Sequence, residues 1–265
     1  MNPKIKIGLL GSQGKMGLSI RQLLKFEEQI HPFIEIAKRP SDEFTLSYKS
    51  IHEVSVETLK AVDVWIDFSR PEGLDDLIDV LAKTKSAVVS GTTGLGDIQI
   101  NKLKKLSAKN AVFWASNMSV GLWTVRQTLK SLKSISHFDF AIDEIHHTQK
   151  KDNPSGTAIT LHQDLELATG KKIPLPRGHR LGGIFGIHTI TAASQSEMIK
   201  IEHNALNRSV FAEGAIKAAV WIFRKNAGLY SMDDLMSSGV KTQRKDLGKQ
   251  KKTVVQKTKQ KQNKK

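Results

Sequence analysis

The chain has 265 residues, enough for two modest domains with cores of their own. Hydrophobic residues make up 39% of it, and no apolar run approaches the ~20 residues that a membrane-spanning helix needs, so a membrane span is excluded. The absence of cysteine excludes disulfides and a cysteine nucleophile, and it agrees with a cytoplasmic location.

The net charge of +15 is concentrated at the C-terminal end. Residues 241–265 hold eleven Lys or Arg and one Asp, a net charge of +10, which leaves +5 for the other 240 residues. This segment is rich in Lys and Gln and almost free of apolar residues, a composition typical of disordered chain. We therefore predict a basic disordered tail over 241–265, whose contact with nucleic acid would be limited to non-specific phosphate binding.

The first motif is a strand followed by a glycine turn and a helix. Residues 4–10 are predicted to form a β-strand, 11–17 read Gly-Ser-Gln-Gly-Lys-Met-Gly, and an amphipathic helix follows to about Phe26. Glycines let the backbone approach a pyrophosphate, and the helix N-terminus favours its charge. The spacing is G-x-x-G-x-x-G and not the commoner G-x-G-x-x-G, so a plain strand–helix turn is the alternative. The dinucleotide interpretation places the cofactor against Gly11, Ser12, Gln13, Gly14, Lys15 and Met16.

A second strand, predicted over 33–37, ends at Lys38-Arg39-Pro40. In a nucleotide-binding fold this strand end faces the adenosine ribose, where an acid suits the 2′-hydroxyl of NAD and basic residues suit the 2′-phosphate of NADP. Lys38 and Arg39 therefore favour NADPH over NADH as the cofactor. The alternative is that both are solvated surface charges.

Further strands alternate with helices up to residue 115. Such alternation predicts a parallel sheet with right-handed crossovers. Ligands bind this kind of sheet beyond the carboxyl ends of its strands, where the chain has the loops Gly91-Thr-Thr-Gly94 and Ser116-Asn-Met-Ser119. We predict strands over 62–68, 87–90 and 111–115, and helices over 74–83 and 97–109.

The second half of the chain centres on residues 144–158, Glu-Ile-His-His-Thr-Gln-Lys-Lys-Asp-Asn-Pro-Ser-Gly-Thr-Ala. Ser155 or Thr157 could cap a helix predicted over 158–168, which Gly170 would end. Imidazole exchanges a proton near neutral pH, lysine supplies a positive charge, and free helix amides bind an anion. The combination suits an anionic substrate that must gain a proton.

Two alternatives account for the same residues. His146 and His147 could be surface residues at a strand end. A zinc site is a further option, but successive strand side chains point to opposite faces, so the two histidines would not readily converge on one metal. The usual cysteine ligands are also absent. No metal is therefore predicted.

The remaining elements would form an antiparallel or mixed sheet with one helix leading into it and one following it. Gly178 to Gly183 reads as a glycine-rich loop, in which Arg180 could bind a substrate carboxylate or form an ion pair on the surface. The strands are expected over 138–144, 186–191 and 197–203, and the helices over 122–132 and 209–225.

The string E-x-H-H-x-x-K-x-D-x-P-S-G-T-A at 144–158 resembles the signature of the dihydrodipicolinate reductase family, now called the 4-hydroxy-tetrahydrodipicolinate reductases. Every fixed position is met, and Asn153 stands where the family more often has Ala. The glycine turn at 11–17 is similar to the start of the family. The other matches are Asp67-Phe-Ser-Arg-Pro71, Gly91-Thr-Thr-Gly94 and Asn117-Met-Ser-Val-Gly121, and together the resemblance covers nearly all of residues 4–240.

This resemblance implies an α/β architecture with two domains. Residues 1–119 and 209–240 would form a Rossmann-type, parallel-sheet dinucleotide-binding domain, to which the helix over 209–225 returns. Residues 120–208 would form a smaller α+β domain for substrate binding and oligomerisation. Members of the family are usually homotetramers built through this second domain.

The resemblance also implies an activity and a set of site residues. The enzyme would reduce a small dicarboxylate, 4-hydroxy-tetrahydrodipicolinate, after loss of water, to tetrahydrodipicolinate in diaminopimelate and lysine biosynthesis, using NADPH or NADH. His146 would be the general acid and Lys150 its cationic partner. Substrate would contact His147, Ser155, Gly156 and Thr157. The nicotinamide end of the cofactor would contact Gly91, Thr92 and Thr93, and the cofactor would also contact Ala115, Ser116, Asn117 and Met118.

Three other functions remain as alternatives: a reductase of another small imino acid, a nucleic-acid-binding protein, and a relative that has lost activity. Removal of the tail distinguishes a nucleic-acid-binding protein from an enzyme. Truncation after Val240 is expected to leave the melting temperature and turnover nearly unchanged, because no apolar face is lost. A nucleic-acid-binding protein would instead lose its ligand, which a salt-dependent binding assay would detect.

Overall fold

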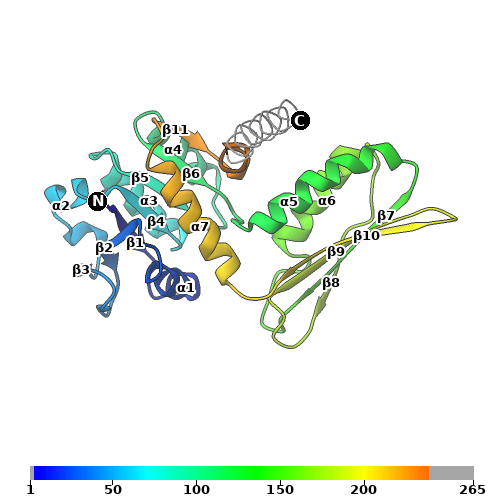
Figure 1. Ribbon diagram of the computed structural model, residues 1–265, viewed down its shortest axis with the longest axis horizontal. Helices are drawn as coiled ribbons and strands as arrows, with labels where there is room; N and C mark the ends of the chain where they lie inside the picture. Colours follow the sequence, from blue (N-terminus) through cyan, green and yellow to red (C-terminus); the bar gives the residue numbers. More distant parts are fainter. Residues whose placement is uncertain (1–2, 239–265) are drawn as a thin grey trace, which may run out of the picture.

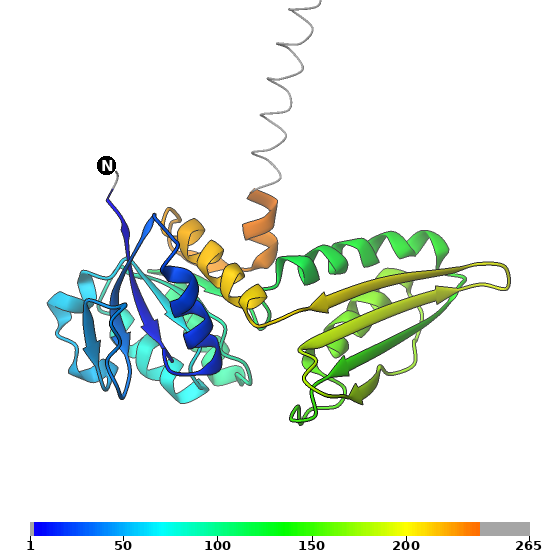
Figure 2. The ribbon, with the colours of Figure 1, turned by 60° about the horizontal axis from the view of Figure 1, so that its bottom comes forward.

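The computed structural model describes residues 3–238, and the predicted tail over 241–265 lies outside the described residues. Within them the chain forms a seven-stranded sheet and a four-stranded sheet, which lie side by side (Figures 1 and 2). The chain passes from the first unit to the second before α5 (Val120–Leu129) and returns before α7 (Ser209–Ile222) (Figure 1). None of the helices in this part of the chain combines the length and the apolar character needed to cross a bilayer.

The first sheet is parallel throughout, with the strand order β3-β2-β1-β4-β5-β6-β11. The chain starts at β1, builds outward to β3, and then returns to place β4 on the other side of β1. The carboxyl ends of β1 and β4 therefore form the switch point at which doubly wound sheets bind ligands. The strands are β1 (Ile5–Leu10), β2 (Ile30–Ile36), β3 (Leu46–Tyr48), β4 (Val64–Asp67), β5 (Ala87–Ser90), β6 (Ala111–Trp114) and β11 (Gly228–Tyr230).

Helices cover both faces of this sheet, so its central strands are apolar on both sides. In β4, Val64 and Ile66 point into the core beside α1 and α7, whereas Trp65 points into the core beside α3 and α4. All four residues of β4 are buried as a result. The helices of this unit include α1 (Lys15–Leu24), α2 (Val56–Lys60), α3 (Pro71–Leu81), α4 (Asp97–Ser107) and α7, with a short 3-10 turn at η1 (Ile51–Glu53). Residues 232–238 are helical as well.

The second sheet has the order β10-β9-β7-β8, antiparallel except for the parallel pair β7–β8. Helices α5 and α6 (Gly156–Thr169) and the 3-10 turn η2 (Lys130–Ile135) cover one face of it. Its strands are β7 (Asp139–His146), β8 (Arg177–Arg180), β9 (Gly186–Ala193) and β10 (Met198–Ala205).

The alternation of β7 decides where the polar residues of the central motif lie. Phe140 and Ile142 are buried under the helices, and the period of two places Glu144 and His146 on the same buried face. The buried face of β7 is thus apolar at its start and carries two titratable side chains at its end. The motif continues from there directly into α6.

The predicted α/β fold class is confirmed, and three local predictions need correction. Residues 178–180 belong to β8, not to a loop, and the glycine at 178 is required by packing, since a Cβ there would lie 1.9 Å from Oδ1 of Asn153. Strand β2 begins at Ile30, because this residue already pairs with Ile5 of β1. Helix α6 begins at Gly156, where Ser155 is the N-cap and Gly170, with φ of 70°, ends the helix.

Candidate active site

A cavity of about 720 Å³ lies between the two units, at the carboxyl edge of the large sheet. From the first unit it receives the loops after β5 and β6 and the segment 231–233. From the second it receives the loop after β7 and the first turn of α6. The amide of Asn117 donates to the hydroxyl of Thr157 at 3.3 Å, and the indole of Trp123 donates to Asp233 at 2.6 Å, so both contacts join the two units at this cavity.

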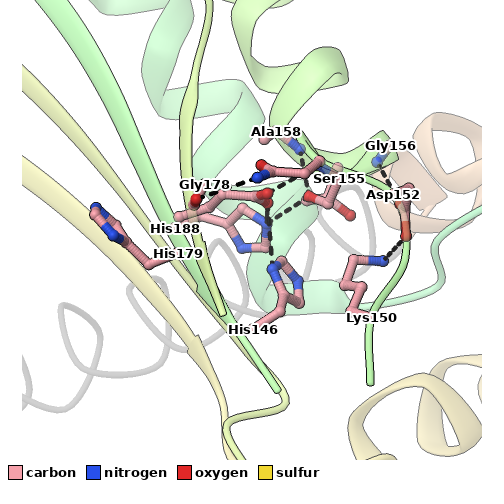
Figure 3. A network of polar contacts seen from close by, with 12 residues as sticks. His146, Lys150, Asp152, Ser155, Gly156, Ala158, Gly178, His179 and His188 are labelled. Carbon is pink, nitrogen blue, oxygen red and sulfur yellow. Dashed lines mark hydrogen bonds and ion pairs between the residues drawn. The ribbon is translucent and has the colours of Figure 1, made fainter. Parts of the chain in front are cut away.

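The second unit contributes a cation and a helix N-terminus to this cavity. Ser155 caps α6 by accepting a hydrogen bond from the amide of Ala158 at 3.1 Å, and the first turn of the helix contains no acidic residue. Gly156 is exposed and has open space where a Cβ would stand. Lys150 lies beside this turn on the loop from β7 (Figure 3). A lysine next to free helix amides is a site for an anion.

Asp152 already fills this anion position in part. Its carboxylate pairs with Nζ of Lys150 at 2.9 Å and accepts a hydrogen bond from the amide of Gly156 at 3.4 Å (Figure 3). Burial opposes its ionisation, but the hydrogen bond and charge of Lys150 outweigh this and lower the pKa of Asp152. An anionic ligand that contacts both Lys150 and the helix terminus would therefore displace this carboxylate.

A buried polar cluster lies behind the cavity, on the inner face of the second sheet. Glu144 accepts a hydrogen bond from the amide of Ser155 at 2.8 Å and an ion-paired one from Arg180 at 3.2 Å. Its other oxygen lies 3.2 Å from Nδ1 of His146 and 3.6 Å from Nε2 of His188. Arg180 also donates to the backbone carbonyls of Lys150 and Asp152, and so it holds the loop that carries the lysine.

The histidines of this cluster titrate below their ordinary range. Burial lowers the pKa of His146, and the charges of Lys150 and Arg180 add to this effect while Glu144 opposes it. Burial likewise lowers the pKa of His188 to about 4. Burial disfavours the ionised form of Glu144, yet the hydrogen bonds from Ser155 and the charges of His146 and Arg180 give a net lowering of its pKa. Near neutral pH the cluster therefore contains a carboxylate and neutral imidazoles.

The glycine turn at the start of the chain has the features of a pyrophosphate cradle. Gly11 has φ of 83°, and a Cβ on it would lie 2.4 Å from the carbonyl oxygen of Phe68 in the loop after β4. Gly14 is the N-cap of α1 and provides no side-chain cap, so the helix amides are free for an anion. A Cβ at Gly17 would lie 2.2 Å from the carbonyl oxygen of Gly11, which lets the helix approach the strand closely. These residues fit a bound dinucleotide.

Gln13 connects this turn to the predicted ribose site. Its side-chain amide donates to the carbonyl of Arg39 at 2.9 Å and its oxygen accepts from the amide of Lys38 at 3.2 Å. Glu35, which is fully buried, accepts a hydrogen bond from the amide of Ser41 at 2.6 Å and fixes the other end of the same segment. The side chains of Lys38 and Arg39 are exposed.

The loop after β5 is held by a buried carboxylate. Asp67 accepts hydrogen bonds from the hydroxyls of Ser90 at 2.6 Å, Thr92 at 2.8 Å and Ser69 at 2.5 Å. Burial raises the pKa of Asp67 above its ordinary value, against the effect of these hydrogen bonds. Asp67 thus fixes Gly91 to Gly94 at the edge of the sheet.

The structure brings only part of the predicted site residues to the cavity. The predicted site residues that line it are Thr93, Ala115, Ser116, Asn117, Lys150, Gly156 and Thr157. His147 is half-buried on the strand end beside His146. Others are buried and do not line the cavity: Ser12 donates to the carbonyl of Ile36, Thr92 to Asp67, and Met118 belongs to the core. Ser155 is the helix cap and His146 is 6% exposed.

Sequence reasoning missed the partners of His146. Glu144 and Arg180 were named without these roles, and Arg180 pairs with a buried carboxylate, not with a surface group. His188 was seen only as part of a strand. The alternating burial of β9 gives a signal for it, because His188 occupies an inward position in line with Ile190.

A doubly wound parallel sheet with a glycine turn at its switch point, joined to a second unit across a cationic cavity, is the architecture of a nicotinamide-nucleotide-dependent oxidoreductase. Family models make the identification specific: the N-terminal model of dihydrodipicolinate reductase matches residues 5–118 and the C-terminal model matches residues 120–236. The chain belongs to the dihydrodipicolinate reductase family.

Relatives and solved structures agree with this assignment. The chain is 45% identical over 233 residues to the 4-hydroxy-tetrahydrodipicolinate reductase of Bdellovibrio bacteriovorus, covering 88% of this chain and 96% of the relative. It is 33% identical to that of Sulfurimonas denitrificans, with 88% and 99% covered. The dipicolinate-bound dihydrodipicolinate reductase from Paenisporosarcina sp. TG-14 has the same fold, with a TM-score of 0.73, 20% identity, and 86% and 97% of the two chains covered.

Proposed function

We propose that this protein reduces 4-hydroxy-tetrahydrodipicolinate, after loss of water, to tetrahydrodipicolinate in diaminopimelate and lysine biosynthesis, with a reduced nicotinamide nucleotide as cofactor. The observation that carries the proposal is the cavity between the units, where Lys150 and the N-terminus of α6 face the loops after β5 and β6. A dicarboxylate fits the lysine and the helix terminus, and a nicotinamide fits the two loops. The cofactor, when bound, supplies the hydride.

The second unit would bind and protonate the substrate. Lys150 and the amides of Gly156 and Thr157 take one carboxylate, with His147 and Ser155 shaping the surrounding loop. His146 supplies the proton. In the free protein the charge of Lys150 lowers the pKa of His146 and that of Asp152, its ion-pair partner, raises it. A dicarboxylate would bring two negative charges where Asp152 now supplies one, which would raise this pKa further, so substrate binding itself would favour the protonated imidazole.

Dipicolinate, the ligand of the Paenisporosarcina structure, is a suitable probe for this placement. Calorimetric titration of the wild-type protein is expected to show binding that weakens with added salt and falls by roughly tenfold in Lys150→Ala. Lys151→Ala is the matched control, because Lys151 is exposed and does not line the cavity. An equal loss of dipicolinate affinity in both variants, or no loss in either, would mean that the dicarboxylate binds elsewhere.

The first unit, residues 3–119 and 209–238 of the described chain, would hold the cofactor. Its glycine turn takes the pyrophosphate, and Lys38 and Arg39 face the ribose and select NADPH. Gln13 supports this arrangement because it ties the backbone of both residues to the glycine turn. NADH would bind the same cradle without the charge-assisted hydrogen bonds to a 2′-phosphate.

We expect a preference for NADPH over NADH of roughly tenfold, corresponding to about 1.4 kcal/mol. The exposure of both side chains and screening by salt keep this free-energy difference below the sum expected for two well-formed charged hydrogen bonds. Lys38→Glu should reduce or reverse the preference, chiefly through the KM for NADPH, whereas Lys49→Glu, which changes an exposed lysine outside this segment, should leave it intact. Equal affinities of the wild-type protein for the two cofactors at low salt would show that neither basic residue reaches the phosphate.

The second unit, residues 120–208, would also form the assembly contact of a homotetramer. Its sheet has helices on one face, while the other bears the half-exposed Ile187, Thr189 and Thr191 of β9. The edge strand β10 exposes Met198 and Ile199. Sedimentation of the protein at several concentrations measures this assembly.

A further inference from the structure

We propose that Glu144 is a positioning residue that holds the proton donor and the anion-binding helix terminus in register through one buried carboxylate. The inference rests on the proposed function for its catalytic consequence. Glu144 is 0% exposed, and its two oxygens face groups from four separate segments of the second unit. These groups are Nδ1 of His146, Nε2 of His188, the amide of Ser155 and the guanidinium of Arg180.

The two oxygens of Glu144 have different tasks. Oε1 accepts from the amide of Ser155 at 2.8 Å and from Arg180 at 3.2 Å. The first contact fixes the N-cap of α6, and the second fixes the arginine that binds the carbonyls of Lys150 and Asp152. One carboxylate oxygen thus anchors both the helix terminus and the loop that bring charge to the cavity.

The other oxygen sets the orientation of His146. Oε2 of Glu144 and Nδ1 of His146 are both buried, and neither has a hydrogen bond within residues 3–238. They lie 3.2 Å apart as an ion-pair contact, and a hydrogen bond between them, which needs only a small rotation of the ring, would satisfy both. A proton on Nδ1, directed at the carboxylate, leaves Nε2 as the nitrogen that exchanges a proton with substrate. Space beside Nε2 is kept by Gly186, where a Cβ would lie 3.0 Å away.

Glu144, His146 and His188 could also be considered as ligands of a metal ion, since their donor atoms all lie within 4.8 Å of one another. The charges around them argue against a cation. Arg180 already pairs with Glu144, and Lys150 is close enough to lower the pKa of His146 by its charge. A carboxylate that is neutralised by an arginine is a weak metal ligand and a good hydrogen-bond acceptor for imidazole.

The first test is the tautomer of His146 in the wild-type protein, measured by nitrogen NMR of isotope-labelled histidine. The signal is assigned by its loss in His146→Gln. Near neutral pH we expect the proton on Nδ1 and a bare Nε2. A proton on Nε2 would overturn the proposal. This measurement needs no turnover, so it stands or falls separately from the proposed reaction.

The second test is kinetic. Glu144→Gln keeps the size of the side chain and removes its charge, and we expect kcat to fall by roughly 10- to 100-fold with little change in the KM for NADPH. The alkaline limb of the kcat profile, on which the proton donor loses its proton, should move to lower pH, because the charge of Glu144 raises the pKa of His146. Glu57→Gln changes an exposed glutamate on α2 that does not line the cavity, so it is the matched control and should match wild type.

Three results would contradict the proposal. The first is a Glu144→Gln variant that is folded and turns over at the wild-type rate. The second is a variant whose kcat falls without any shift of the pH profile, which would indicate a structural role alone. The third is a wild-type enzyme that a chelator inactivates and zinc restores, because the cluster would then bind a metal. If Glu144→Gln fails to fold, the tautomer in the wild-type protein still decides the matter.

Discussion

Replacing Lys150 with alanine is expected to lower turnover by roughly 10²-fold or more, and replacing His146 is expected to have an effect of the same size. Lys150 is the cation of the second unit that lies beside the α6 terminus in the cavity, whereas Arg126, which also lines the cavity, is ion-paired with Asp164. Without Lys150 the negative charge of the substrate is opposed mainly by helix amides. His146 is the proposed proton donor, buried behind the cavity. The measurement is kcat in assays saturated with substrate and cofactor.

The control for Lys150 is Lys151→Ala, which removes an equal charge from an exposed neighbour and should leave kcat within about twofold. Both active-site variants should keep the native circular dichroism spectrum. Near-wild-type rates for both would refute the mechanism, whereas loss of the fold in His146→Ala, a buried position, would call for the larger replacement His146→Gln.

Acidification from about pH 6.5 to pH 4 is expected to cost the folded state up to about 3 kcal/mol through His188 alone. Burial lowers the pKa of this residue from 6.5 to about 4, and the charge of His146 adds to the effect. Between these two values the unfolded chain binds a proton that the folded protein does not. The free energy of unfolding therefore rises with pH across this window. The stabilisation from the neutral His188 is complete above the window and fully lost below it.

Urea unfolding at a fixed protein concentration and a series of pH values measures this slope. His188→Gln should flatten this slope. The remainder is due to His146 and His203, whose pKa values burial lowers as well, and near pH 4 to carboxyl groups such as Glu43, whose pKa the hydrogen bond from Arg21 lowers to about 2. His137→Gln changes an exposed histidine and should keep the full slope. An unchanged slope in His188→Gln would place the acid sensitivity elsewhere in the protein.

Local patterns were sufficient to predict much of this fold. Alternating strands and helices predicted the parallel sheet, and the glycine turn after β1 predicted a helix terminus free to bind an anion. The period of β7 and the Pro-Ser-Gly sequence predicted the strand and helix that flank the central motif. In each case the pattern that predicts the element is local in the sequence and agrees with the fold as a whole.

The features that were missed depend on contacts between distant segments. The sequence around Gly178 is typical of a loop. The reason for glycine is the close approach of the side chains of Glu144 and Asn153, which come from the neighbouring strand and loop. The edge strands β3 and β11 are three residues each and have no periodicity to detect. His188 gains its role from β7, which lies beside β9 only in the folded sheet. The buried cluster behind Lys150 therefore required the structure.

The most direct test of the account is oxidation of NADPH by the wild-type protein, followed by absorbance, with and without freshly prepared 4-hydroxy-tetrahydrodipicolinate. We predict rapid oxidation that depends on this substrate, that dipicolinate inhibits, and that is slower with NADH at equal concentrations. No substrate-dependent oxidation of either cofactor by folded protein would contradict the proposed reaction.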